Sequence, residues 1–223
     1  MDFRNEYKHE ITAIDCISLR ARLSAVLKPD SNGTNGRYKI RSLYFDDLSD
    51  TALKEKTNGV NLREKFRIRY YNRDTSFIRL EKKSKINGLC NKQSAAISAE
   101  EAQRIIDGDI EWMAQSGRPL VTELYVKMKT KGIRPKTIVD YTRDAFIFPA
   151  GNVRVTLDYN IRSALCCTDM LNPNCVTVPV GDSYGVLEVK WDGYLPDFIK
   201  DLVQTEGLRT GAFSKYAACR IYG

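Results

Sequence analysis

The sequence predicts an α+β fold in which helices cover the outside of a closed antiparallel β-barrel. Several segments alternate charged and apolar residues with a period of two, which is typical of strands that bury one face. Segments with helix-capping signals stand between them. The length of 223 residues suits a single domain, 1–223, with one sizeable core.

Two of the expected helices begin with a capping box, in which a Ser or Thr side chain and an acidic side chain three residues later cap each other's backbone. Thr12 and Asp15 open the first of these helices, which ends before Pro29. Ser98 and Glu101 open the second, which ends near Gly108. The apolar stripe expected for the first helix comprises Ile14, Ile17, Ala21 and Leu23.

Three further helices are indicated by proline, glycine and serine at their ends. One covers residues 119–129, and another runs from Pro196 to Gly207. Ser214 caps a last short helix over residues 216–221. The residues expected to face the core are Leu120, Leu124, Met128, Ile199, Leu202 and Val203.

The expected strands carry almost purely ionic polar faces. In the segment 65–70, Lys65, Arg67 and Arg69 share one face, and apolar or aromatic residues share the other. The same alternation occurs in segments 4–10, 78–83, 153–158 and 187–191. An ordinary solvent-facing strand would mix in Thr, Ser and Gln. If the helices cover the apolar faces of a barrel, the ionic faces must point into its lumen.

The composition narrows the chemistry that such a lumen could perform. The net charge of +7 indicates an anionic partner. His9 is the single histidine, which argues against a His-dependent catalytic triad or a His-rich metal site. The six cysteines form no C-x-x-C pair, and we expect them to be reduced thiols. Neither a secretory signal nor a membrane span is recognisable, so a soluble cytoplasmic protein is expected.

A basic lumen with a few carboxylates suits a polyphosphate or a nucleoside triphosphate. Arginine and lysine pair with phosphate oxygens more strongly in a confined space than on a surface. Carboxylates in the same space offset the mutual repulsion of the cations and supply the hard oxygen ligands that Mg²⁺ or Mn²⁺ prefers. A metal bridging phosphates would polarise the bond to be cleaved, and catalysis would rest on positioning and charge.

An ordered set of short motifs resembles the VTC branch, the polyphosphate polymerase domain, of the CYTH or triphosphate tunnel metalloenzyme superfamily. The resemblance runs from about Arg4 to Tyr216. In chain order the motifs are Glu6-Tyr7-Lys8, Arg41-Ser42-Leu43-Tyr44-Phe45-Asp46, Lys65-Phe66-Arg67-Ile68-Arg69, Leu80-Glu81-Lys82-Lys83, Tyr141-Thr142-Arg143, Val153-Arg154-Val155-Thr156-Leu157-Asp158, Leu187-Glu188-Val189-Lys190 and Ser214-Lys215-Tyr216.

The resemblance implies a tunnel of eight antiparallel strands that polymerises the γ-phosphate of ATP into polyphosphate with Mn²⁺ or Mg²⁺. It implies phosphate-binding catalytic roles for Lys8, Arg67, Arg69, Lys83, Arg143, Arg154, Lys190 and Lys215. It also implies that Lys92, Tyr141 and Ser214 contact phosphate or nucleotide. The implied metal ligands are Glu188, Glu6 and Glu81, with Glu188 first among them.

One position departs from the family pattern: Ala212 stands where eukaryotic polymerase domains carry a lysine. The loss of that lysine is expected to weaken polymerisation and to leave triphosphate binding intact. The sensor domain and membrane segments of the eukaryotic subunits are also not found, which leaves a membrane partner open.

Three alternatives to a polymerase follow from the same residues. A hydrolase of the same fold would cleave inorganic triphosphate or a nucleoside triphosphate, using a positioned water as the nucleophile. A non-catalytic module would only bind polyphosphate, although a pure anion binder gains nothing from Glu188 and Glu6. A nucleic-acid binder ranks last, because the sequence shows neither a stacking platform nor a basic helix. Acceptor, product length and oligomeric state stay open.

Overall fold

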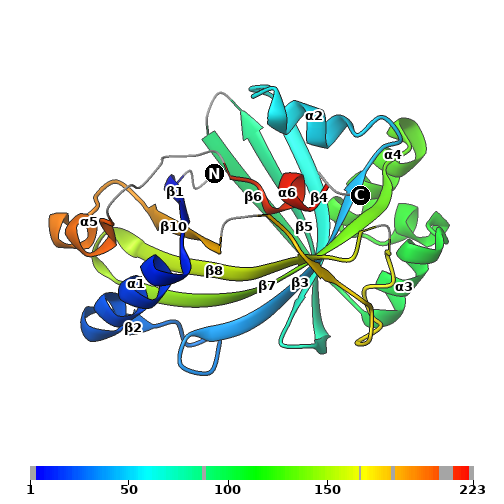
Figure 1. Ribbon diagram of the computed structural model, residues 1–223. Coiled ribbons are helices and arrows are strands. Elements are labelled where there is room, and N and C mark those ends of the chain that lie inside the picture. The colour runs from blue at the N-terminus through cyan, green and yellow to red at the C-terminus, as the bar shows by residue number, and fades with distance from the viewer. Residues whose placement is uncertain (1–3, 87–88, 166, 182–183, 206–212, 221–223) are drawn as a thin grey trace.

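The computed structural model describes residues 4–86, 89–165, 167–181, 184–205 and 213–220 (Figure 1). The strands are β1 (Asn5–Ile11), β2 (Lys28–Pro29), β3 (Arg37–Asp46), β4 (Arg63–Tyr71), β5 (Asp74–Ile86), β6 (Leu89–Ile97), β7 (Arg134–Phe148), β8 (Val153–Ser163), β9 (Val178–Pro179) and β10 (Gly185–Trp191). The helices are α1 (Ala13–Val26), α2 (Thr51–Thr57), α3 (Ala99–Asp107), α4 (Pro119–Lys131), α5 (Asp197–Val203) and α6 (Lys215–Arg220), with short 3₁₀ turns at Glu111–Gln115 and Ala150–Asn152.

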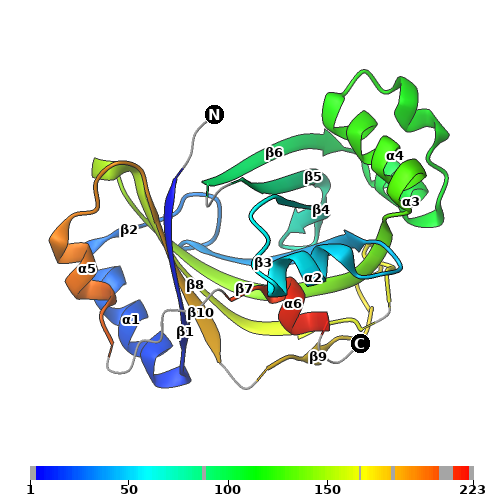
Figure 2. The same cartoon turned by 90° about the horizontal axis from the view of Figure 1, so that it is seen from above.

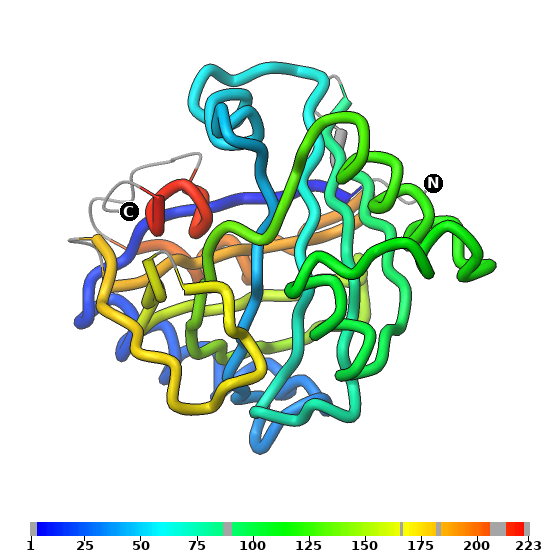
Figure 3. The backbone as a smooth tube through the Cα atoms, turned by 90° about the vertical axis from the view of Figure 1, so that its right-hand side faces the viewer, coloured from blue at the N-terminus to red at the C-terminus, as the bar shows by residue number. Residues whose placement is uncertain are grey.

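The sheet is one antiparallel path of eight strands in the order β1-β10-β8-β7-β3-β4-β5-β6, with β2 paired to β7 and β9 to β8. In Figure 3 the blue β1 and the orange β10 run side by side across the molecule, above β8 and β7. The α+β class and the antiparallel strands of the prediction are confirmed.

Closure of the barrel is not found. Within the described ranges no backbone pairing joins β1 to β6, so the sheet is open and these two strands form its edges. Alternation in a sequence determines which face of a strand is buried, but not whether two edge strands approach to the roughly 4.8 Å that a ladder needs. Long side chains cross between β1 and β5 instead, as described below.

Helix α1 begins at the predicted capping box but packs through a different face. The Thr12 hydroxyl accepts the Asp15 N–H at 3.2 Å, and the Thr12 N–H donates to the Asp15 carboxylate at 2.9 Å. Ile14 and Ile17 of the predicted stripe are 77% and 64% exposed, and Ala21 is exposed as well. The buried residues are Cys16, Leu19 and Leu23. Both stripes have helical spacing, and docking on the sheet selects between them.

The other predicted helices are present, with small differences at their ends. Ser98 and Glu101 form the capping box of α3, and Gly108 ends this helix with a left-handed φ of 83°. The hydroxyl of Ser214 accepts the Ala217 N–H at 3.3 Å at the start of α6. Helix α5 ends at Val203, and the predicted end at Gly207 lies outside the described residues, as does Ala212.

The helices cover the apolar faces of the charged strands, as predicted. One apolar core joins Phe66, Ile68 and Leu80 of β4 and β5 to residues of α3 and α4. A second core joins apolar residues of β8 and β10 to α1 and α5. Figure 2 shows α1 and α5 at one end of the sheet and α3 and α4 at the other. The charged side chains therefore lie on the opposite face of these strands.

None of the helices in the described part of the chain has the length and apolar character that crossing a bilayer requires.

Candidate functional site

The inner face of the sheet is the face opposite the helices α1, α3, α4 and α5. Residues directly opposite each other on paired strands point to the same side. Glu188 on β10 lies opposite Lys8 on β1 and Thr156 on β8. Lys190 lies opposite Glu6 and Arg154. The register thus places these charged side chains from three adjacent strands on the inner face.

Glu6 and Glu188 form a cluster with three lysines. Lys8 contacts Glu6, and its Nζ lies 3.5 Å from Glu188 Oε2. Lys190 contacts Glu188, and its Nζ lies 3.7 Å from Glu6 Oε2. The third lysine, Lys83, reaches from β5 with its Nζ 3.6 Å from the same Glu6 oxygen. This last contact spans the open side of the sheet between β1 and β5.

The lysines keep both glutamates ionised. Burial alone would raise the pKa of Glu188, but Lys190 and Lys8 hold it well below its ordinary value. Burial and the nearby charge of Glu188 would raise the pKa of Glu6, and Lys83 together with its other lysine neighbours lowers it. The cluster therefore carries two carboxylates that are charged at neutral pH.

Asp158 on β8 anchors two more of the predicted cations. The Arg143 guanidinium donates to it through Nε at 2.6 Å and Nη2 at 2.7 Å, and Lys215 Nζ lies 2.6 Å away. Burial alone would raise the pKa of Asp158, but Arg143 and Lys215 lower it to about 2. Because Lys215 is the first residue of α6, this carboxylate holds α6 at the inner face.

Glu81 on β5 is the centre of a third ionic group, on a different wall. Arg67 donates to it through Nε at 2.7 Å, Arg69 Nη1 lies 3.8 Å away, and Lys92 Nζ lies 2.5 Å away. Burial would raise the pKa of Glu81, but its cationic neighbours, chiefly Arg67, lower it to about 2. Lys92 belongs to β6 and is 54% exposed, so it lies at the rim of this group.

Tyr141 on β7 connects the groups around Glu81 and Asp158. Its hydroxyl accepts a hydrogen bond from Arg69 Nη2 at 3.0 Å. Its ring lies 5.5 Å from the Arg143 guanidinium and 4.9 Å from Lys215 Nζ. Arg69 is further fixed by Ser42, whose hydroxyl accepts from Nε at 2.8 Å. The predicted residue Tyr141 thus touches cations from β4, β7 and α6.

Two predicted residues lie outside these three groups. Arg154 pairs with Asp30 at 2.5 Å and donates to the Tyr38 hydroxyl, which places it beside the loop after β2. The Ser214 hydroxyl caps α6 by accepting a hydrogen bond from the Ala217 N–H. A direct contact of Ser214 to phosphate would have to compete with this cap.

Sequence reasoning missed the roles of Lys65, Asp158 and Thr156. Lys65 Nζ lies 5.4 Å from the centre of the Tyr44 ring. Among the described residues, no carboxylate forms an ion pair with Lys65. Burial lowers the pKa of Lys65 to about 8, and Tyr44 opposes this shift only in part. The first basic position of the 65–69 alternation was the signal that could have identified it.

The residues present fit a divalent metal at the Glu6–Glu188 pair. Lys8 and Lys190 each reach both carboxylates, so the oxygens of Glu6 and Glu188 converge on shared cations. The buried Thr156 hydroxyl beside them has no hydrogen-bond partner among the described residues. These are hard oxygen donors, which Mg²⁺ and Mn²⁺ prefer. Glu81 lies with Arg67 instead, and no set of three acidic, His or Cys ligands occurs in the described ranges.

Comparison with solved structures shows where this fold recurs. The chain superposes on the PH1819 protein from Pyrococcus horikoshii OT3 with a TM-score of 0.50 and 12% identity, over 96% of both chains. The PH1012 protein from the same organism gives a TM-score of 0.47 and 14% identity, over 92% of this chain and 94% of that one. At such low identity the likeness to PH1819 shows the fold alone. No curated protein matches the sequence.

The structure thus shows an open antiparallel sheet with an ionic inner face and helices on its outside. The profile of the VTC domain matches residues 3–221. The chain therefore belongs to the VTC domain family.

Proposed function

We propose that this protein is a polyphosphate polymerase that transfers the γ-phosphoryl group of ATP to the end of a polyphosphate chain on the inner face of the sheet. The bond between the γ-phosphorus and the β–γ bridging oxygen breaks, and a terminal oxygen of the acceptor chain forms the new P–O bond. ADP leaves with the bridging oxygen. The alternative reactions of this fold transfer the same group to water.

The observation that carries the proposal is the meeting of paired cations and carboxylates from opposite walls of the sheet. Lys83 from β5 and Lys190 from β10 both lie within 4 Å of one Glu6 oxygen. A phosphate chain brings several charged oxygens to such a place and can replace carboxylates as partner of the cations. Membership of the VTC domain family supports the same substrate class.

Each ionic group would take a separate part of the substrate. The cations around Asp158 and Glu81 would bind phosphate oxygens, because guanidinium forks match them in geometry. Tyr141 would fix Arg69 through its hydroxyl, as it does without substrate. Catalysis of phosphoryl transfer depends mainly on positioning and on stabilising charge, which a wall of fixed cations provides.

A divalent metal would be held by Glu188 and Glu6, with Thr156 beside them. When bound, such an ion supplies positive charge to the phosphate oxygens as a Lewis acid. Lys8 and Lys190 occupy positions between the two carboxylates in the protein described here. With the two carboxylates holding the ion, Lys8 and Lys190 would be available to bind phosphate oxygens.

The test incubates the purified protein with ATP and Mn²⁺, separates the products on a polyacrylamide gel stained for polyphosphate, and quantifies ADP and free phosphate. Glu188→Gln keeps the shape of the side chain and removes its charge. Glu100→Gln, at an exposed position of α3, makes the same chemical change away from the inner face. We expect a polyphosphate ladder and ADP from the wild type and Glu100→Gln, and neither from Glu188→Gln.

Two other outcomes would assign a different function. Free phosphate without a ladder would make the protein a tunnel-fold hydrolase. Tight binding of polyphosphate without turnover, under every metal condition, would make it a binding module. An equal ladder from Glu188→Gln would contradict the assigned role of Glu188 in holding the metal.

A further inference from the structure

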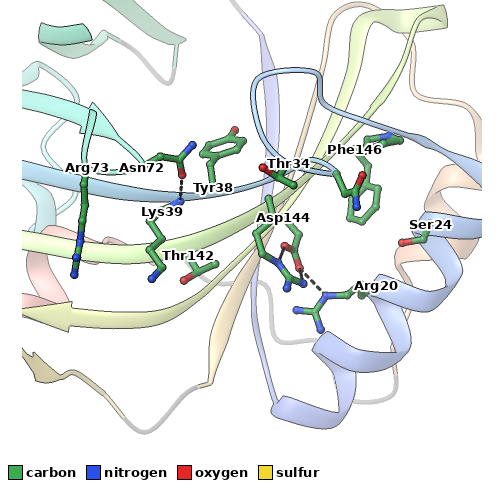
Figure 4. A pocket seen from close by; sticks show the side chains of 13 residues that line it. Arg20, Ser24, Thr34, Tyr38, Lys39, Asn72, Arg73, Thr142, Asp144 and Phe146 are labelled. Carbon is green, nitrogen blue, oxygen red and sulfur yellow. Dashed lines mark hydrogen bonds and ion pairs between the residues drawn. The ribbon is translucent and has the colours of Figure 1, made fainter. Parts of the chain in front are cut away.

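A basic groove lies on the outer face of the sheet, away from the inner face. It consists of two adjoining hollows of about 840 and 230 Å³ over β3 and β7. Lys39, Arg73 and Thr142 line both hollows, so they mark the place where the two meet. Figure 4 shows the larger hollow between α1 and the turn that joins β4 to β5. We call this feature the outer groove.

The outer groove has more cations than carboxylates. Its two carboxylates are Asp140 and Asp144. Its six cations are Arg20, Arg37, Lys39, Arg41, Arg73 and Arg162. The groove lies between the regions that α1 and α4 cover, on strand faces where polar residues replace the apolar residues of the two cores.

Both carboxylates are already satisfied by neighbouring arginines. Asp144 accepts from Arg20 Nε at 2.6 Å and from Arg37 Nε at 2.7 Å, and it is only 4% exposed. Asp140 accepts two hydrogen bonds from Arg41, at 2.9 and 2.8 Å. These pairs fix the guanidinium groups on the floor of the groove and leave the excess of positive charge in place.

Lys39 and Arg73 supply that excess where the two hollows meet. Both side chains are exposed, and in the described part of the chain neither has a carboxylate partner. The Asn72 side-chain oxygen accepts the Lys39 N–H at 2.9 Å, which holds the β4–β5 turn against β3. Asn72 and Arg73 take left-handed φ angles of 51° and 62° in this turn. A fixed turn therefore presents Arg73 beside Lys39.

The cations of β3 lie in a row. Arg37, Lys39 and Arg41 alternate with Tyr38 and Ile40, so they share the outer face. At about 3.3 Å per residue the row is about 13 Å long. A row of this length suits an extended polyanion better than a single phosphate ion.

We propose that the outer groove is a second binding site for inorganic polyphosphate, which holds a part of the chain that lies beyond the inner face. This inference rests on the proposed function, because it takes the polyphosphate of the inner face as its ligand. Guanidinium groups bind phosphate oxygens through two parallel donors, and the groove offers arginines from α1, β3 and the β4–β5 turn. A short triphosphate occupies only the inner face, whereas a long chain reaches both sites.

The test compares long-chain polyphosphate with tripolyphosphate as ligands in a binding titration at low ionic strength. The variant Lys39→Glu/Arg73→Glu reverses two charges in the groove. The control Lys54→Glu/Lys131→Glu reverses two charges at exposed positions of α2 and α4. These two helices lie at the upper right of Figure 1, away from α1. We expect the groove variant to bind long chains about tenfold more weakly than the control, and tripolyphosphate equally well.

The outcomes separate this inference from the proposed function. If the wild type binds neither ligand, the proposed function fails. If both ligands bind and the groove and control variants bind long chains equally, the groove site is overturned while the proposed function stands. If poly-glutamate of the same length competes with long-chain polyphosphate as strongly as polyphosphate itself, the groove has no preference for phosphate and the inference is wrong.

Discussion

Arg143 and Asp158 form a two-point ion pair, with Nε 2.6 Å from Oδ1 and Nη2 2.7 Å from Oδ2. The Asp158 side chain is fully buried, and Lys215 joins it from α6. The Arg143–Asp158 pair links β7 to β8, and Lys215 links both strands to α6. One carboxylate thus fixes two of the cations that the family resemblance assigns to phosphate.

Asp158→Asn is expected to lower the free energy of unfolding by about 3–5 kcal/mol, because it leaves two buried cations without their carboxylate. Asp109→Asn is the matched control. Asp109 pairs with Arg104 on the surface, where the loss should be below about 1 kcal/mol. Urea denaturation of the three proteins measures both effects. Equal losses in the two variants would show that Asp158 is not a structural anchor.

The lowered pKa of Asp158 predicts how the stability of the protein depends on pH. The pKa of Asp158 is lowered from an ordinary 3.8 to about 2 in the folded protein. The unfolded state therefore binds more protons than the folded state in this window. The stabilisation from Asp158 is fully present above pH 3.8 and is lost as the pH falls toward 2. Thermal unfolding of wild type and Asp158→Asn should converge across that range.

Lys65 should bind phosphate at a cost to stability. Its charged amine is half-buried beside Tyr44, with a pKa lowered to about 8 from 10.5. Below pH 8 the folded protein bears the full cost of this charge, and the free energy of unfolding rises as the pH increases from 8 to 10.5. Lys65→Met should raise stability at pH 7, flatten that rise and weaken tripolyphosphate binding about tenfold.

Lys54→Met, at an exposed position of α2, is the control for Lys65→Met, and it should alter neither the pH dependence nor the binding. Thermal unfolding at a series of pH values and a binding titration give the two readouts. A Lys65→Met protein that is destabilised at pH 7, with unchanged affinity, would refute a functional role for this lysine.

Thr156 offers a way to separate metal binding from folding. Its hydroxyl is buried beside Glu188, and no partner for it occurs in the described ranges. Because an unsatisfied buried hydroxyl is unfavourable, Thr156→Val should leave the free energy of unfolding unchanged or raise it by about 1 kcal/mol. If the hydroxyl faces the metal, the same variant should need more Mn²⁺ for half-maximal ADP formation.

Thr137→Val provides the comparison for Thr156→Val, because the Thr137 hydroxyl is buried but hydrogen-bonded to the Leu165 carbonyl at 2.8 Å. This variant should lose stability and keep its Mn²⁺ requirement. If Thr156→Val is destabilised like Thr137→Val, an unobserved partner inside the fold satisfies Thr156.

The shared face of the charged side chains could be predicted from the sequence because alternation is a local property. In 65–70 the period of two places Arg67 and Arg69 together and opposite Phe66, whatever the rest of the chain does. The capping boxes at Thr12 and Ser98 are equally local and were confirmed. The role of Asp158, in contrast, depends on Lys215, which lies 57 positions later in the sequence and approaches only through α6.

The errors have the same physical origin. Both faces of α1 have helical spacing, and only docking on the sheet buries Leu19 instead of Ile17. Closure of the barrel depends on the distance between β1 and β6, which periodicity does not encode. The position of Glu81, apart from Glu6 and Glu188, also follows from strand order, since Glu81 lies among cations of β4 and β6. Its role as a metal ligand stays a prediction.

Tyr216 holds α6 against the sheet. Its hydroxyl donates to Asp46 Oδ2 at 2.6 Å, and its ring stacks on Tyr44 with 5.0 Å between the ring centres. Asp46 also accepts hydrogen bonds from the N–H groups of Ala52 and Leu53 in the first turn of α2, so it contacts both α2 and α6. Removing the Tyr216 hydroxyl takes one hydrogen-bond donor away from the buried Asp46 carboxylate.

Tyr216→Phe should lower the free energy of unfolding by about 1–3 kcal/mol. Tyr125→Phe, which removes a hydroxyl bonded to exposed Glu111, should cost less than about 0.5 kcal/mol. Since Lys215 precedes Tyr216 on α6, loosening this helix should also weaken tripolyphosphate binding. Urea denaturation and a binding titration on the same samples test both effects. If Tyr216→Phe loses the expected stability but binds tripolyphosphate as tightly as the wild type, Lys215 does not contribute to binding and α6 is not part of the phosphate site.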